Sequence, residues 1–219
     1  MALQPIARLA WAVIVAVVSA REVGGQAVVT SSTRVEARPT IRRTVPPPST
    51  DFTTYVEGQL VQVSVPSNWR ELPGANAVAF APEGAYGNSG VKSVFTHGVG
   101  MGLARNDKRD LRATTDDFIA STVLVNPRSA GVTGGRAPGP FPQRRVTIGD
   151  RPGLHTEVST ISEATGEFER IEIYTALLRD GTLFYVLAVT PRDRVSDYAA
   201  TFRRVIRSIA IMDCDGCVR

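Results

Sequence analysis

The sequence contains few histidines and cysteines, two residue types that many enzymes and metal centres use. Its 219 residues include two histidines, His97 and His155, and two cysteines, Cys214 and Cys217. No H-E-x-x-H segment occurs, which excludes the common zinc-peptidase motif. Two thiols alone cannot complete a four-ligand zinc site. Because the sequence has no complete catalytic motif, we expect a non-enzymatic protein without a cofactor.

A long hydrophobic run is also missing. The longest apolar stretch, ten residues from Leu9 to Val18, would span about 15 Å as a helix, half of a bilayer core of about 30 Å. Arg8 precedes it and small residues follow, which is typical of a secretory signal in residues 1–27. Cleavage after either Ala20 or Ala27 fits this pattern. We expect an exported protein, periplasmic or extracellular, without a permanent membrane span.

The folded part of the chain lacks a basic surplus. The net charge of +4 divides into +1 for residues 1–27 and +3 for residues 28–50, which leaves residues 51–219 neutral. A neutral body does not offer the positive surface that phosphate backbones require, so nucleic acid is not an expected partner.

Two segments beside the folded part have no sustained periodicity. Residues 28–50 end in three consecutive prolines, which predicts a disordered Pro-rich linker. Residues 213–219 form a C-terminal tail with the spacing C-x-x-C. Because an exported chain permits disulfides, Cys214 and Cys217 can form one, although a thioredoxin-like role would need the motif at the start of a helix.

The clearest pattern in the chain is a closing amphipathic helix. Apolar residues recur there at three- and four-residue steps, which places them on one stripe: Val195, Tyr198, Ala199, Phe202, Val205, Ile206 and Ile209. An earlier helix is expected to begin near Thr114 and Thr115, whose hydroxyls can cap free amides, and to end at Asn126-Pro127.

The remaining apolar and alternating runs predict strands. Three precede the first helix, among them a run with Val61, Val63 and Val65 on one face and a single strand over residues 91–101. Four more lie between the helices, joined by turn signals such as Asp180-Gly181 that permit antiparallel neighbours. The prediction for residues 51–212 is thus an α+β domain in the order βββαββββα, an antiparallel sheet sandwiched by helices.

Two segments carry a resemblance to a known family. The segment VSVPSNW, near residue 65, and the segment FYVLAVTP followed by YAATFRRVIRSI, near the end, are similar to the Mog1/PsbP-like superfamily. The resemblance covers about residues 52–211 and implies an α/β/α sandwich. It is nearest to bacterial exported versions, which occur alone or appended to membrane zinc peptidases. Members of this superfamily are generally non-catalytic accessory or binding domains.

We therefore expect an exported accessory domain that binds an envelope protein or a small apolar ligand. The expected binding surface lies at a sheet end with Trp69, Tyr86 and Phe141, beside a Gly- and Pro-rich loop in residues 129–143. Loops on a rigid scaffold are common binding sites.

Two alternatives from other functional classes stay open. His155 and Glu157 share one strand face, and with His97 across the sheet they could hold a metal with an open position, as in a metal-assisted hydrolase. A structural stabiliser of a larger complex would instead need an exposed apolar patch.

Overall fold

A computed structural model describes most of the predicted domain. The described ranges are 44–57, 60–74, 76–89, 92–105, 109–122, 141–162 and 164–213. The predicted signal 1–27, most of the predicted linker, residues 129–140 of the Gly- and Pro-rich loop, and Cys214 and Cys217 lie outside these ranges. Across the described ranges, neither helix has the length and apolar character that a membrane crossing needs.

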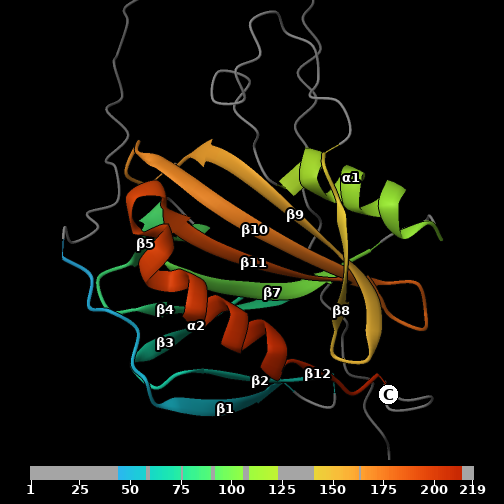
Figure 1. Cartoon of the computed structure of the whole chain (residues 1–219), viewed down its shortest axis with the longest axis horizontal. Helices are drawn as coiled ribbons and strands as arrows, with labels where there is room; N and C mark the ends of the chain where they lie inside the picture. The colour runs from blue at the N-terminus through green and yellow to red at the C-terminus, as the bar shows by residue number, and fades with distance from the viewer. Residues whose placement is uncertain are drawn as a thin grey trace, which may run out of the picture. The chain divides into compact units, whose positions relative to one another are not determined.

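The centre of the fold is a seven-stranded sheet in which all neighbours are antiparallel (Figure 1). Its strands, in spatial order, are β3 (Trp69–Pro73), β4 (Ala77–Pro82), β7 (Gly98–Ala104), β11 (Leu183–Pro191), β10 (Phe168–Leu177), β9 (Arg151–Ile161) and β8 (Arg144–Ile148). The four strands predicted between the helices are confirmed, and β11 occupies the central position.

Three shorter strands form a second sheet in the order β1-β2-β12. They are β1 (Phe52–Glu57), β2 (Val61–Pro66) and β12 (Ala210–Ile211). Val61, Val63 and Val65 alternate toward the core on β2, as predicted. A separate hairpin pairs β5 (Tyr86–Ser89) with β6 (Lys92–Phe95).

The two helices lie on opposite faces of the large sheet, which confirms the predicted α+β sandwich. Successive strand residues point to opposite faces, and alternate residues join two separate buried clusters. The α2-side core contains Val63, Val65, Phe80, Met101, Tyr174, Phe184, Val186, Tyr198, Phe202 and Val205, among others. The α1-side core contains Phe118, Ile119, Val158, Ile171, Ile173, Leu183 and Val189.

Helix α2 (Val195–Ser208), which follows the short 3-10 helix η1 (Arg192–Arg194), confirms the predicted apolar stripe. Tyr198, Phe202, Val205 and Ile206 are buried, and each large side chain buried in this way contributes about 2 kcal/mol of transfer free energy. At its end, the Ser208 hydroxyl accepts the backbone N–H of residue 64 at 2.8 Å. This bond ties the helix to β2.

Helix α1 (Leu111–Thr122) begins three residues before the predicted start. Asp110 provides the cap, because its carboxylate accepts the backbone N–H groups of Arg112 and Ala113 at 3.2 and 3.4 Å. Thr114 instead donates its hydroxyl to the Asp110 carbonyl at 2.8 Å, one turn inside the helix. The predicted hydroxyl cap at Thr114 and Thr115 is therefore wrong, because the Asp110 carboxylate caps the helix.

The single strand predicted over residues 91–101 is in fact two strands, β6 and β7, separated by Thr96 and His97. Directly after the break comes Gly98, the first residue of β7, whose φ of +139° is accessible to glycine but strained for other residues. A Cβ there would also lie 2.1 Å from the Phe80 carbonyl oxygen. At Gly102 a Cβ would lie 2.6 Å from the Asn76 carbonyl oxygen, so the glycines of β7 permit close backbone packing.

The last residues of the predicted linker contact the domain. Val45 is only 6% exposed. The Asn68 side chain accepts the backbone N–H of Ser49 at 2.9 Å and donates to the Pro47 carbonyl at 2.8 Å. Ordered contacts with the domain therefore begin before residue 51.

Candidate functional site

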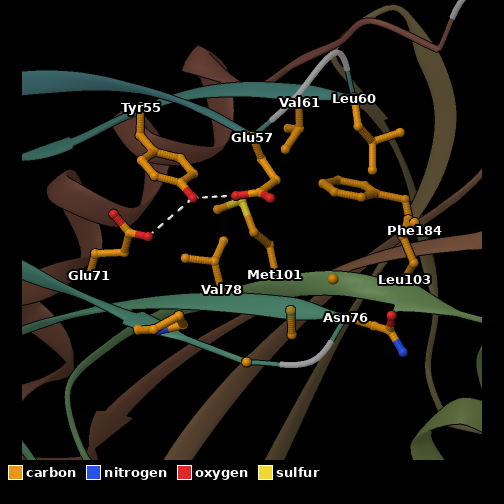
Figure 2. A pocket seen from close by; sticks show the side chains of 14 residues that line it. Tyr55, Glu57, Leu60, Val61, Glu71, Asn76, Val78, Met101, Leu103 and Phe184 are labelled. Carbon is orange, nitrogen blue, oxygen red and sulfur yellow. Dashed lines mark hydrogen bonds between the residues drawn. The ribbon is translucent and has the colours of Figure 1, made fainter. Parts of the chain in front are cut away.

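A pocket of about 380 Å³ lies between the β1-β2 hairpin and the part of the large sheet formed by β3, β4 and β7 (Figure 2). Strand β11 also reaches it through Phe184. Both sheets contribute side chains, so the pocket exists because the small sheet packs over the edge region of the large one. Its volume falls within the range of about 300–1,000 Å³ that is typical of small-molecule sites.

Local backbone geometry places the polar lining residues. Tyr55 and Glu57 are two residues apart on β1, so they share one face of that strand. Glu71 faces them from β3 (Figure 2). A tight turn joins β3 to β4, where the Gly74 N–H donates to the Ala77 carbonyl at 2.8 Å. A Cβ on Gly74 would lie 2.9 Å from that carbonyl oxygen, so the turn requires glycine.

One phenol between two carboxylates forms most of the polar lining, to which Asn76 also belongs. The Tyr55 hydroxyl donates a hydrogen bond to Glu57 and lies 3.3 Å from Oε1 of Glu71. Burial, followed by the two carboxylates, raises the pKa of Tyr55 well above its ordinary value. The Tyr55 ring packs edge-on against Phe80, with ring centroids 4.9 Å apart. Tyr55 is therefore a fixed, protonated donor at neutral pH.

The rest of the lining is mainly apolar. The apolar residues with the largest side chains are Leu60, Val61, Val78, Met101, Leu103 and Phe184. Met101 and Phe184 are each 1% exposed and belong to the α2-side core, so the floor is held rigidly. None of the described residues that line the pocket is a lysine, an arginine or a histidine. The pocket thus combines an apolar floor with a negatively charged rim.

The three residues of the predicted binding surface do not form one surface. Trp69 is buried against Phe202 of α2, with ring centroids 6.4 Å apart. Tyr86, on β5, donates its hydroxyl to Glu83 at 2.8 Å. Phe141 packs against the α1-side core, on the opposite face of the large sheet from Trp69. The sequence grouped them because all three are aromatic residues near turn signals.

His97 is buried in the turn between β6 and β7. Its Nδ1 lies 2.9 Å from the Thr96 hydroxyl, and its ring packs against Tyr198 with centroids 5.3 Å apart. Burial, and to a lesser degree the Arg194 guanidinium, lower the pKa of His97 to about 4. His97 is therefore a neutral core residue at neutral pH.

His155 and Glu157 belong to a polar cluster on β8, β9 and β10. The His155 ring lies between Arg144, whose guanidinium is 3.2 Å from Nδ1, and Glu172, whose Oε2 is 3.5 Å from Nε2. Contact with His155 lowers the pKa of the Glu172 carboxyl. Glu157 pairs with Arg170 at 2.7 Å instead of pointing to a shared ligand position with His155.

The three residues of the alternative metal site are not brought together. β7 and β9 are three strand spacings apart in the sheet, about 14 Å, and His97 lies just before β7. Within the described part of the chain, no group of three His, Cys, Asp or Glu side chains could hold a metal ion. The cluster around His155 is accounted for by its own ion pairs.

Large exposed hydrophobic side chains are few in the part of the chain that the structure describes. They are Val56 on β1, 51% exposed, and Phe168 on β10, 49% exposed. These strands belong to different sheets. They do not form the contiguous patch that a structural stabiliser of a larger complex would need.

The sequence analysis missed the pocket residues because it missed β1. The segment FTTYVE, residues 52–57, has Val56 exposed while Tyr55 is half-buried, so its apolar residues do not mark one face. One weak signal was present: an aromatic hydroxyl and a carboxylate two residues apart, at Tyr55 and Glu57. That spacing becomes meaningful only once Glu71 is known to face the same space.

Comparison with known proteins gave matches to solved structures only. No protein-family model and no curated protein sequence matches the chain. A solution structure of the cyanobacterial PsbP of Synechocystis is 11% identical, with a TM-score of 0.47; the match covers 73% of this chain and 92% of that one. The Ran-binding protein Mog1p of Saccharomyces cerevisiae is 10% identical, with a TM-score of 0.46 and coverage of 75% and 97%.

A crystal structure from Bacteroides thetaiotaomicron also matches, at 12% identity and a TM-score of 0.41, over 72% of this chain. This match covers 47% of the Bacteroides protein, so the chain spans about half of that protein's length. Solved structures of a PsbP and of Mog1p are therefore among those to which the chain is similar, each with a TM-score below 0.5. At these identities the likeness concerns the fold alone.

Proposed function

We propose that this chain is an exported, non-enzymatic accessory domain that binds a small, mainly apolar ligand in the pocket between β1-β2 and β3-β4-β7. The observation that carries the proposal is the rigid apolar floor, formed by side chains such as Val78, Met101 and Phe184, in a cavity of about 380 Å³. Export rests on the signal expected in residues 1–27. Of the two kinds of partner expected from the sequence, a concave apolar pocket favours the small ligand over an envelope protein.

The lining also favours binding over catalysis. The described residues around the pocket include neither serine nor cysteine nor histidine nor lysine, the usual nucleophiles and bases of acyl transfer. Its tyrosine has a raised pKa and therefore acts as a hydrogen-bond donor rather than a base. Glu57 and Glu71 are exposed carboxylates, which suit recognition of a polar group at the rim.

The test is native mass spectrometry of the protein after export from a bacterial host, compared with its mass after denaturation. A retained organic molecule that is released on denaturation supports the proposal. The pocket variant is Val78→Phe, because Figure 2 shows the Val78 side chain among those lining the cavity and a larger ring would fill it. We expect this variant to lose the added mass.

The matched control is Val56→Phe, which makes the same change at an exposed valine on β1 that does not line the pocket. We expect it to retain the ligand like the wild type. A ligand that survives equally in both variants would show that it binds elsewhere and would refute the proposed site.

A further inference from the structure

We infer that the ligand of this pocket carries a positively charged group, an ammonium or a guanidinium, held at the rim between Glu57 and Glu71 with its apolar body on the floor. This inference deepens the proposed function and rests on it. The observations are two carboxylates at the rim of an apolar cavity, together with a lining that includes no basic side chain among the described residues.

The hydrogen bonds at the rim do not use all the lone pairs of the two carboxylates. An ionised carboxylate has about four lone-pair positions, whereas a tyrosine hydroxyl has a single proton to donate. Both Glu57 and Glu71 depend on the Tyr55 hydroxyl, and no other described residue donates a hydrogen bond to either. A ligand with several N–H donors would supply what the protein does not.

The charge of the rim selects against other head groups. Glu57 and Glu71 both approach one phenol oxygen, so they lie close enough to repel each other. A cation between them removes this repulsion, while an anionic head group such as a fatty-acid carboxylate would add to it. A ligand with a neutral head group would make the apolar contacts but would not reduce the repulsion between the two carboxylates.

A hydrogen bond from a tyrosine to a glutamate also occurs outside the residues that line this pocket. Glu83 accepts the Tyr86 hydroxyl at 2.8 Å, but it also has a cation nearby, Arg70, at 3.9 Å. At Glu83 the protein provides its own counter-charge. In the pocket, the exposed carboxylates Glu57 and Glu71 have no basic side chain among the described lining residues and lie beside the apolar floor, which points to a ligand that brings both parts.

The experiment uses three probes with the same alkyl chain and different heads: octylamine, octanol and octanoate. Each is titrated at neutral pH and low salt into the full exported protein, and binding is followed by NMR on the methyl group of Met101. We expect octylamine to bind about tenfold more tightly than octanol, because charge-assisted hydrogen bonds are stronger than neutral ones by an amount that corresponds to about this ratio of affinities. We expect octanoate to bind most weakly.

Variants of the rim carboxylates distinguish binding of the charged head group from binding of the alkyl chain. Glu57→Gln and Glu71→Gln should each remove part of the preference for octylamine over octanol, and the double variant should remove it entirely while octanol still binds. Glu83→Gln is the control, because it removes a tyrosine-bonded carboxylate outside the pocket, and it should leave the preference unchanged.

The outcomes distinguish the two claims. Equal binding of octylamine and octanol in the wild type, both lost in Val78→Phe, would overturn the charged-head inference and leave the apolar pocket standing. Failure of all three probes to shift the Met101 methyl would overturn both. A preference for octylamine that persists in the double variant would locate the cation site elsewhere and would also overturn the inference.

Discussion

Burial of His97 makes the stability of this domain depend on pH in a specific window. The imidazole is 7% exposed, packs on Tyr198, and contacts the Thr96 hydroxyl through Nδ1. The same hydroxyl lies 3.2 Å from the Ala85 carbonyl oxygen. A second proton on the imidazole would place a charge in the core beside Arg194.

The sign and size of the effect follow from the pKa. The pKa of His97 is about 4 in the folded protein against an ordinary 6.5, so the folded state binds the proton less readily than the unfolded state. The resulting stability is fully present above pH 6.5 and is lost as the pH falls toward 4. Between pH 7 and pH 5 the loss is about 2 kcal/mol of unfolding free energy.

The assay is urea unfolding at pH 7 and pH 5, followed by the fluorescence of buried Trp69, for the wild type and His97→Gln. Glutamine keeps polar groups at the site but does not ionise. We expect the wild type to lose about 2 kcal/mol more than the variant between the two pH values. Parallel losses, or an NMR titration midpoint for His97 near 6.5, would refute the reasoning.

Three further predictions concern stability. Gly98→Ala should lower the free energy of unfolding by at least about 3 kcal/mol, because the added Cβ would meet the Phe80 carbonyl. Gly181 also has a positive φ but has open space around it, so Gly181→Ala should lower the free energy of unfolding by only about 1 kcal/mol. Urea midpoints of the two variants test this difference. Phe202→Ala should cost about 4 kcal/mol, measured by thermal unfolding, and a cost below about 1 kcal/mol would contradict its place in the core. Asn68→Ala should speed proteolytic cleavage near residues 44–50, and an unchanged cleavage rate would show that these contacts do not hold the segment.

The parts of the fold with a strong period could be predicted from the sequence. The stripe from Val195 to Ile209 follows the helical repeat, and five of its seven residues are buried: Tyr198, Phe202, Val205, Ile206 and Ile209. Val195 and Ala199 are half-buried. The run Leu183–Val189 is apolar at every position, which favours a strand covered on both faces, and β11 is central in the large sheet. The two helices on opposite faces follow from these elements.

The parts that could not be predicted depend on contacts between distant segments. Nothing near His97 in sequence shows that Gly98 adopts a positive φ against Phe80, which splits the predicted strand in two. The carboxylates at the rim of the pocket, Glu57 and Glu71, are close only because the small sheet packs over β3 and β4. Aromatic residues near turns, such as Phe141, did not predict the binding surface, because the burial of a side chain and not its residue type decides whether it can bind a ligand.

The most direct test of the central claim is to locate the alkyl chain of a bound ligand. Met101 is one of three methionines in the sequence, so selective methyl labelling gives a simple spectrum in which intermolecular nuclear Overhauser effects can be assigned. With octylamine bound, the account predicts effects from the alkyl chain to the Met101 methyl and to Val78, two residues of the pocket lining. Effects confined to residues outside the pocket would contradict the proposed site.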